Sequence, residues 1–363
     1  MLTDPFDTPE ARLPPIDTWR KLFPSTTVHQ RVSIRNPETA QSVANAFIPE
    51  GSRDKVVIEA YPGPGQLTRA LLQLPKNRIR KLIVLEEYEP YLQYLRPLEK
   101  LDSRLTVLPI NGYAWDSYEE IHNLGLLGDV PKVPWDGDAV HPNLHFISTL
   151  PLTVIGEQLI AQLFRSIPDA QWLFQYGRIP LSFLLSEYVW KRVSATTDDI
   201  SMRCKLSVIA EAVATCQEAL PFDSLQPYDE HFHPTRISVT ANADRKAKNR
   251  RVGNPFQAIT VTPRTERIIQ KGKLDQWDFC LRRLFVRKAT PLKGALSSLA
   301  PNGQVLLKKI DDPNLPPEER LNVKKAIRSM SVQDWSILLK AFDEWPFAPD
   351  DLSIGDTFIP LKE

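Results

Sequence analysis

Two glycines and two glutamates have the spacing expected of a nucleoside site. Gly63 and Gly65 lie in the segment Glu59-Ala60-Tyr61-Pro62-Gly63-Pro64-Gly65-Gln66-Leu67-Thr68, and Glu86 ends the next apolar run. Glycines let the backbone approach a ligand, and a helix that starts there offers free N–H groups. Residue 86 lies 21 positions after residue 65, close to the roughly 20 that separate such a loop from an acidic residue that binds ribose hydroxyls. The spacing predicts an adenosine-type ligand, with a plain Gly-Pro turn and a chance acidic residue as the equal alternative.

Buried strands and amphipathic helices are expected to position this loop. The compact apolar runs that predict strands are residues 55–59, 82–86, 105–108, 144–148 and 172–176. The periodic stretches that predict helices are residues 37–47, 67–74, 156–164 and 182–193. Alternating strands and helices imply parallel pairing. The predicted fold is therefore α/β, a doubly wound Rossmann-like sheet.

The chain has four predicted parts. Strand-like runs are missing from residue 264 onward, which predicts a smaller, mainly helical C-terminal domain. Five prolines and little periodicity near the start predict an extended arm, with Trp19, Leu22 and Phe23 as candidate anchors. The predicted parts are the N-terminal arm at 1–28, the Rossmann-like domain at 29–263, the helical domain at 264–342 and an acidic tail at 343–363.

Composition excludes several classes of protein. A content of 42% hydrophobic and 25% charged residues is typical of globular chains and not of disordered ones. No apolar run reaches the roughly 18 residues that span a bilayer, so we expect no membrane partner. The cysteines are Cys204, Cys216 and Cys280, an odd number without metal-ligand spacing, which argues against disulfides and zinc. His231 and His233 lack an adjacent third ligand, so we expect no metal site.

Positive charge is concentrated in one segment. Residues 236–288 carry 14 Lys or Arg against four Asp or Glu, an excess of +10 in a chain of net charge +1. Such a segment is either a solvated loop or a surface for phosphates. We interpret it as nucleic-acid-binding, and the residues expected to contact phosphates are Arg245, Lys246, Lys248, Arg250, Arg251, Arg282, Arg283, Arg287 and Lys288.

Several motifs, taken in order, resemble those of the class I rRNA adenine dimethyltransferases. They are Glu59 to Thr68, Glu86, the segment Thr149-Leu150-Pro151-Leu152 and Cys204-Lys205-Leu206-Ser207-Val208. Later segments are similar to those of the fungal mitochondrial transcription initiation factors, which descend from these enzymes. These segments are Trp277-Asp278-Phe279, Lys288-Ala289-Thr290-Pro291-Leu292 and Glu344-Trp345-Pro346-Phe347-Ala348-Pro349-Asp350.

The resemblance implies a function, partners and a location. It implies a factor that helps a single-subunit mitochondrial RNA polymerase to recognise and melt promoter DNA, with contacts to the melted single strand. The alternative is an active S-adenosylmethionine-dependent dimethyltransferase of mitochondrial small-subunit rRNA. The implied location is the mitochondrial matrix, although residues 1–25 are not an Arg-rich presequence. The resemblance also places the acidic tail near the template strand, where it would repel DNA.

The enzyme motifs are degenerate. The enzymes end a strand in Asn-Leu-Pro-Tyr, where the Asn holds the target amino group and the Tyr stacks on the flipped adenine. Aligning the Leu-Pro pair puts Thr149 at the Asn position and Leu152 at the Tyr position, so both roles are lost. A competing register uses Asn143 to Phe146. Tyr61 replaces the first loop glycine, and no carboxylate is present near Asn111.

The degenerate motifs predict a noncatalytic protein that requires no cofactor. S-adenosylmethionine could still bind if the pocket is retained. By resemblance, its vestigial or weak contacts would be Gln30, Glu59, Gly63, Gly65, Glu86 and Asn111.

Overall fold

The computed structural model describes residues 6, 8–24, 31–137, 139–235, 251–349 and 351–352. The chain divides into two compact units. The sheet unit comprises residues up to Ser166, Ala170–Trp190 and Ala214–Thr265. The helical unit comprises Ile167–Asp169, Lys191–Val213 and the chain from Glu266 onward. Each unit is described by itself.

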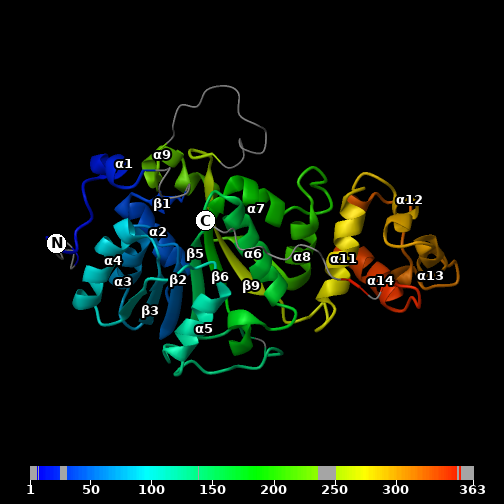
Figure 1. The fold of residues 1–363 in the computed structure, drawn as a ribbon, viewed down its shortest axis with the longest axis horizontal. Helices are drawn as coiled ribbons and strands as arrows, with labels where there is room; N and C mark the ends of the chain where they lie inside the picture. Colours follow the sequence, from blue (N-terminus) through cyan, green and yellow to red (C-terminus); the bar gives the residue numbers. More distant parts are fainter. Residues whose placement is uncertain are drawn as a thin grey trace. The chain divides into compact units, whose positions relative to one another are not determined.

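A seven-stranded sheet forms the centre of the sheet unit (Figure 1). Its order is β4 (Leu105–Leu108), β3 (Ile79–Leu85), β2 (Lys55–Ala60), β5 (Leu144–Thr149), β6 (Leu181–Ser186), β9 (Phe256–Pro263) and β7 (Ala214–Glu218). The strands from β4 to β6 are parallel, and β9 runs antiparallel to both of its neighbours. Ala60 pairs with Leu85 and with Ser148, so β2, β3 and β5 end at the same edge. The predicted α/β, doubly wound Rossmann-like class is confirmed.

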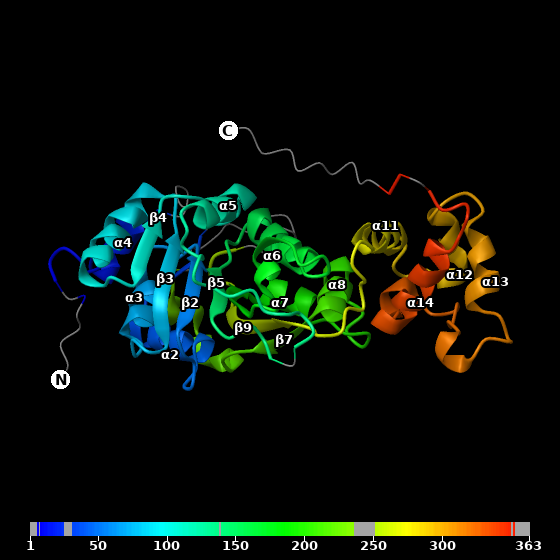
Figure 2. The same ribbon diagram turned by 90° about the horizontal axis from the view of Figure 1, so that it is seen from below.

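Helices cover both faces of this sheet (Figure 2). They are α2 (Pro37–Phe47), α3 (Gln66–Gln73), α4 (Glu89–Leu101), α5 (Trp115–Asn123) and α6 (Val154–Ser166). The start of α2 follows from its sequence, because the Asn36 side chain accepts the N–H groups of Glu38 and Thr39 at 2.8 and 3.3 Å and Pro37 needs no partner at the first helical position. This helix has the predicted bounds.

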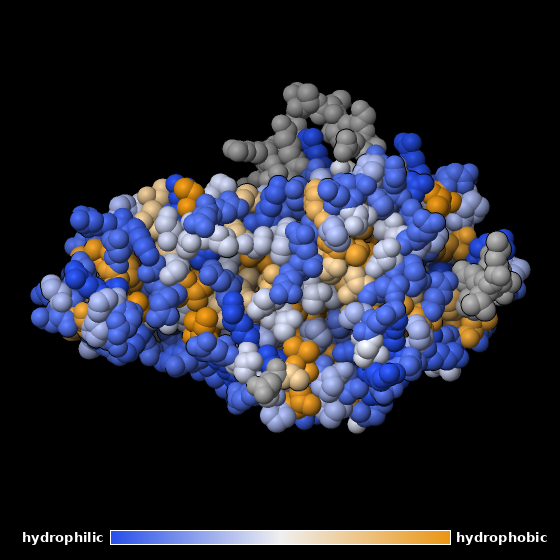
Figure 3. Space-filling view, turned by 180° about the vertical axis from the view of Figure 1, so that it is seen from behind, coloured by the Kyte–Doolittle hydropathy of each residue, from blue (hydrophilic) through white to orange (hydrophobic). Residues whose placement is uncertain are grey.

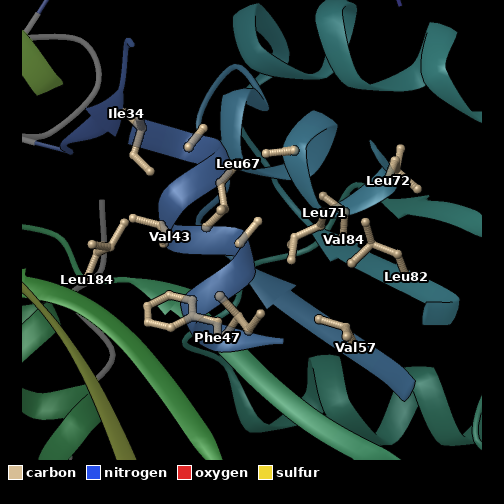
Figure 4. Close-up of a cluster of buried hydrophobic side chains, with 14 of the residues drawn as sticks. Ile34, Val43, Phe47, Val57, Leu67, Leu71, Leu72, Leu82, Val84 and Leu184 are labelled. Atoms are coloured by element: carbon tan, nitrogen blue, oxygen red, sulfur yellow. The ribbon is translucent and has the colours of Figure 1, made fainter. Parts of the chain in front are cut away.

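A core of buried aliphatic side chains joins α2 and α3 to the sheet (Figure 4). Val43 of α2 and Leu71 of α3 belong to the same cluster as Val57 of β2 and Leu82 of β3, and all four have no exposed surface. On the other face, the rings of Tyr118 and Trp172 contact the ring of Phe146. Side chains alternate across each strand, so both faces of the central strands are buried.

Two predicted elements are wrong. Residues 172–176 form a 3₁₀ helix, η2 (Trp172–Tyr176), because Trp172 at φ 57° and Gly177 at φ 124° cannot continue an extended strand. The predicted helix at 182–193 is strand β6 followed by α7 (Glu187–Val193). All six residues of β6 are buried, and a strand buried on both faces has the same continuous apolar pattern as a buried helix.

The sheet unit also contains several short elements, some of them in the N-terminal segment. They are η1 (Ile16–Thr18), α1 (Trp19–Leu22), β1 (Ser33–Ile34), η3 (Phe222–Leu225), α9 (Tyr228–His231) and β8 (Phe232–His233), with β1 and β8 antiparallel. Trp19 and Phe23 are buried and cluster with Tyr91, whereas Leu22 is 37% exposed. Two of the three expected anchors therefore pack.

The helical unit has its own core. Its elements are α8 (Lys205–Val213), α11 (Leu274–Phe285), α12 (Leu292–Ala295), η4 (Leu296–Ser298), η5 (Gly303–Leu306), α13 (Leu307–Ile310), η6 (Pro317–Glu319), η7 (Ile327–Ser329) and α14 (Val332–Asp343). The rings of Phe285 and Trp335 stack with centroids 5.7 Å apart. Trp345 is buried, but Phe347 is 78% exposed.

One segment lies in a different unit from the one expected. Residues 191–213 were expected with the sheet, whereas the structure groups them with the helical unit. The reason is packing, because α8 contacts both α11 and α14. The buried Arg203 adds a hydrogen bond of 3.1 Å to the carbonyl of Met330.

The face drawn in Figure 3 is predominantly hydrophilic. On the face drawn in Figure 3, hydrophobic side chains form separate patches among polar ones. No helix within the described residues is long and apolar enough to cross a bilayer.

Candidate cofactor site at the carboxyl edge of the sheet

The glycine loop connects β2 to α3 at the edge where a doubly wound sheet binds nucleotides. Gly63 and Gly65 have φ of 62° and 90°, and Tyr61 has φ of 58°. A Cβ at Gly63 would collide with the Ser33 side chain, and one at Gly65 with the Leu95 side chain. The chain itself therefore fills the space next to both glycines.

The acid expected to bind ribose hydroxyls is engaged inside the protein. Arg31 Nη1 and Nη2 donate to the two carboxylate oxygens of Glu86 at 2.6 and 2.5 Å. The N–H of Tyr88 donates to Glu86 Oε1 at 2.9 Å. Glu86 is only 1% exposed, so a ribose could reach its oxygens only by displacing Arg31.

Two tyrosine rings enclose the Arg31 guanidinium. Its central carbon lies 4.9 Å from the ring centroid of Tyr61 and 5.1 Å from that of Tyr91. Burial lowers the pKa of Arg31, but the charge and hydrogen bonds of Glu86 raise it by more than burial lowers it. The pKa of Arg31 is therefore raised overall. This arginine remains charged, and cation–π contacts add to its ion pair.

Asn111 extends the same network. Its Oδ1 accepts the Tyr61 hydroxyl at 3.1 Å and the Tyr113 N–H at 2.8 Å, and its Nδ2 donates to Glu87 at 2.7 Å. We call Arg31, Tyr61, Glu86, Tyr91 and Asn111 the Arg31 cluster. Each member contacts at least one other member, and together they occupy the edge where a nucleoside would bind.

Glu59 is a buried carboxyl group beside the loop. Its Oε2 accepts the Thr68 hydroxyl at 2.7 Å, and its Oε1 has no hydrogen-bond partner among the described residues. Burial raises the pKa of Glu59 to about 8, and the nearby charge of Glu86 adds to this. At neutral pH this group is therefore mostly protonated.

The degenerate motif lies at the carboxyl end of β5. Thr149 ends the strand, and Leu150 and Leu152 are 2% and 4% exposed. Their side chains provide no amide and no aromatic ring. The competing register fails geometrically, because Asn143 precedes β5 at the opposite edge, where its carbonyl accepts the Val56 N–H at 2.9 Å.

The remaining residues that were expected to bind the cofactor or nucleic acid lie partly outside the described residues and partly on the two units. Gln30, Arg245, Lys246, Lys248 and Arg250 lie outside the described residues, and Arg251 is half-buried. In the helical unit, Arg282 is half-buried, whereas Arg283, Arg287 and Lys288 are exposed.

The sequence reasoning missed Arg31 and Tyr91. A lone arginine next to the alternating apolar residues Val32 and Ile34 was the available signal for a buried ion pair. The partner could not be identified, because it lies 55 residues away.

The two histidines that lack an adjacent third ligand contact other groups of the sheet unit. His231 Nδ1 contacts the Thr39 hydroxyl at 2.7 Å, and His233 Nε2 donates to the Phe23 carbonyl at 3.1 Å. Both imidazoles thus take part in packing. No group of three or more metal-ligating side chains occurs within the described ranges.

The seven-stranded sheet, with its strand order and its glycine loop after β2, is a methyltransferase-like Rossmann fold. A family model described as ribosomal RNA adenine dimethylase matches residues 33–331. The chain belongs to this family.

Within this family, the chain is similar to several individual curated proteins. The chain is 24% identical over 304 residues to Mitochondrial transcription factor 1 of Lachancea kluyveri, covering 81% of this chain and 82% of that protein. It is 26% identical over 306 residues to Mitochondrial transcription factor 1 of Saccharomyces cerevisiae, covering 82% of each. Dimethyladenosine transferase 1, mitochondrial, of Xenopus tropicalis is 29% identical over 189 residues, covering 49% of this chain and 50% of that protein.

Among solved structures, the 23S rRNA methyltransferase ErmE aligns with a TM-score of 0.49 and 14% identity. This alignment covers 86% of this chain and 99% of that one. The resemblance expected from the motifs is confirmed by the family match and the curated relatives.

Proposed function

We propose that this protein is a mitochondrial transcription initiation factor that uses a degenerate dimethyltransferase unit as a scaffold. Its partners would be a single-subunit mitochondrial RNA polymerase and promoter DNA, including the melted strand. The observation that carries the proposal is the Arg31 cluster, because Arg31 holds the carboxylate of Glu86 that a methyl donor's ribose would need. Similarity to Mitochondrial transcription factor 1 over 82% of the chain supports it.

No cofactor is required in this proposal. The remaining vestigial contacts would be Gln30, Glu59, Gly63, Gly65 and Asn111. Displacing Arg31 would leave a buried charge unpaired, which costs about 3–5 kcal/mol. The contacts of S-adenosylmethionine would have to contribute more binding free energy than this cost.

A second candidate is an active rRNA adenine dimethyltransferase. Family membership favours it, as does the retained position of Glu86 at the end of β3. Thr149 and Leu152 oppose it, because neither can hold or stack on a target adenine. We rank this candidate second.

A basic surface of the helical unit is our candidate for DNA contact. The Arg328 N–H donates to the Lys288 carbonyl at 3.0 Å, and the Lys293 N–H donates to the Val323 carbonyl at 3.1 Å. Two basic segments far apart in sequence are thus side by side. We call the cations they carry, together with Arg283 at the end of α11, the C-terminal basic surface: Arg283, Arg287, Lys288, Lys293, Lys324 and Arg328.

This surface lacks acidic residues within its own segments. There is no Asp or Glu in residues 279–310 or 320–333. Bringing like charges together is unfavourable unless counter-charges are supplied, and DNA phosphates can supply them. Arg282, which precedes Arg283 in the sequence, and Arg245, Lys246, Lys248, Arg250 and Arg251 would add further contacts.

The proposed location is the mitochondrial matrix, since the relatives carry mitochondrial names. We also retain as proposals the N-terminal arm at 1–28, the domains at 29–263 and 264–342, with residues 191–213 moved to the second in keeping with their packing, and the tail at 343–363. The tail would repel DNA until the promoter opens.

The deciding experiment is run-off transcription on a mitochondrial promoter by the mitochondrial polymerase, with and without this protein. We expect promoter-specific product only when the protein is present. Calorimetric titration with S-adenosylmethionine and a methyl-transfer assay on a small-subunit rRNA hairpin test the second candidate. Stoichiometric dimethylation of adjacent adenines, without any effect on run-off synthesis, would reverse our ranking.

A further inference from the structure

A cavity of ≈ 480 Å³ lies in the sheet unit between α5 and η2. This is within the range of about 300–1,000 Å³ that holds small ligands or large side chains. It is separate from the Arg31 cluster, because none of that cluster's residues lines it.

One wall of the cavity is a single face of α5. Trp115, Glu119 and Asn123 line it and recur every four residues, which places them one above another on a helix. Trp172, Gln175 and Tyr176 of η2 also line it. The Trp115 and Trp172 ring centroids lie 6.0 Å apart, and Trp115 is 38% exposed. Aromatic faces and amide groups are therefore accessible from solvent.

The η2 wall is held in an unusual conformation. Trp172 and the nearby Ala170 have φ of 57° and 50°, values that bulky residues rarely adopt. The indole Nε1 of Trp172 is buried and has no hydrogen-bond partner among the described residues. Residues in such strained conformations cluster at active sites and ligand-binding sites.

The helix α5, which forms one wall of this cavity, carries acidic side chains and no Lys or Arg, which favours a cationic ligand. Residues 105–131 contain no Lys or Arg, but they include Asp116, Glu119, Glu120 and Asp129. Asp129 pairs with Arg80 and, at 3.1 Å, with Lys81. The Glu119 carboxylate has no ion-pair or hydrogen-bond partner within the described parts of the chain. Glu119 lines the cavity, and its carboxylate would repel a phosphate-bearing ligand.

One wall residue already attracts a cation. The ammonium of Lys132, which does not line the cavity, lies 5.7 Å from the ring centroid of Tyr176. Aromatic faces bind cations through the ring quadrupole, and arginine also stacks flat on tryptophan.

We infer that this cavity receives an arginine side chain of a protein partner. The planar guanidinium would stack on the exposed indole and pair with the Glu119 carboxylate. Its five N–H donors match the carboxylate and the side-chain carbonyls of Asn123 and Gln175. A lysine ammonium offers only three donors and no flat face. This inference does not depend on the proposed DNA contact.

The test uses the full chain and three short blocked peptides. The probes are acetyl-Gly-Arg-Gly-amide and its lysine and citrulline counterparts, titrated while the indole N–H signals are followed by NMR. We expect saturable shifts of the Trp115 and Trp172 signals with the arginine peptide. Citrulline keeps the shape but not the charge, so its binding should be at least about tenfold weaker.

A neighbouring glutamate provides the matched control. Glu119→Gln should weaken binding of the arginine peptide about tenfold, whereas Glu120→Gln, on the same helix but not lining the cavity, should leave it unchanged. Equal losses in both variants would indicate only a general acidic surface and overturn the inference. Absence of binding, or tighter binding of adenosine monophosphate at the same indole signals, would also overturn it.

Discussion

Arg31 and Glu86, 55 residues apart in the chain, form a two-bond ion pair at 2.6 and 2.5 Å between the tyrosine rings of residues 61 and 91. The pair lies where a ribose would bind in a doubly wound sheet. The protein thus supplies from its own chain a cation that neutralises the acid that a ribose would need.

We predict that Arg31→Met lowers the free energy of unfolding by about 3–5 kcal/mol, because Glu86 is left buried and unpaired. Urea unfolding measures this change. Arg96→Met is the control, since it removes the exposed pair with Glu89, which has an N–O distance of 2.8 Å, and should cost at most about 1 kcal/mol. Adding Glu86→Gln to Arg31→Met should recover part of the loss. If both single variants behaved alike, the Arg31 pair would contribute no more than a surface contact.

Stability should depend on the ionisation of Glu59. Its folded pKa of about 8 lies above the ordinary 4.5, so its contribution is fully present below pH 4.5. That contribution is lost as the pH rises to about 8, by at most about 1.4 kcal/mol per pH unit. Glu59→Gln should therefore become more stable relative to the wild type across this range.

The measurement is urea unfolding of both proteins from pH 5 to about 9, compared as a difference. The difference matters because burial lowers the pKa of His145 to about 3, which makes stability rise with pH as unfolded histidine loses its proton near pH 6.5. Both proteins share His145, so its effect cancels. A constant difference across the range would show that Glu59 titrates normally.

The C-terminal basic surface should contribute to the salt dependence of DNA binding. Replacing Lys293, Lys324 and Arg328 with Ala should weaken binding and reduce the logarithmic salt slope by about 0.9 per lost phosphate contact on duplex DNA, or about 0.7 on single strands. Lys271, Lys308 and Lys340 are exposed lysines of the same unit outside this surface, so their replacement serves as the control. Equal effects of the two triple variants would assign the binding to net charge alone.

The segment at 245–251 makes a separate prediction. Replacing Arg245, Lys246, Lys248, Arg250 and Arg251 with Ala should also lower the DNA affinity and the salt slope. Filter binding at several salt concentrations measures both. An unchanged slope would assign these charges to solvent.

Removing residues 350–363 should raise the DNA affinity of the isolated protein and impair promoter-specific initiation. Residues 343–363 carry six acidic residues and one base, so the tail repels phosphates. The helical unit should stay folded, because Trp345 still packs on Phe342 with ring centroids 6.3 Å apart. Replacing the four acids of 350–363 with Asn or Gln separates charge from length and should reproduce the gain in affinity. Unchanged affinity and normal run-off synthesis in both variants would refute the tail's role.

The sequence was sufficient for the parts of the fold that depend on local pattern. The cap at Asn36 and the apolar face of α2 are local, and so are the runs that became β2 to β5. Local pattern could not separate strand β6 from a helix, because both of its faces are buried. It also missed β7 and β9, whose pairing connects residues far apart in sequence.

The candidate site was only partly predictable for the same reason. The spacing of the loop glycines and Glu86 in the sequence predicts a nucleoside site. Tyr61 and residues 149–152 stand out because they differ from the dimethyltransferase motifs. The contact that decides whether Glu86 is available comes from Arg31, which no spacing rule connects to it.

The crowding of Gly63 and Gly65 affects how such loops are used to assign enzymes. Any side chain at Gly63 would strike Ser33, and any at Gly65 would strike Leu95, whether or not a ligand binds. Selection for folding alone would thus keep both glycines in place. A glycine fingerprint of this type reports how a loop packs, and genome surveys that equate it with methyl transfer would count scaffolds as enzymes.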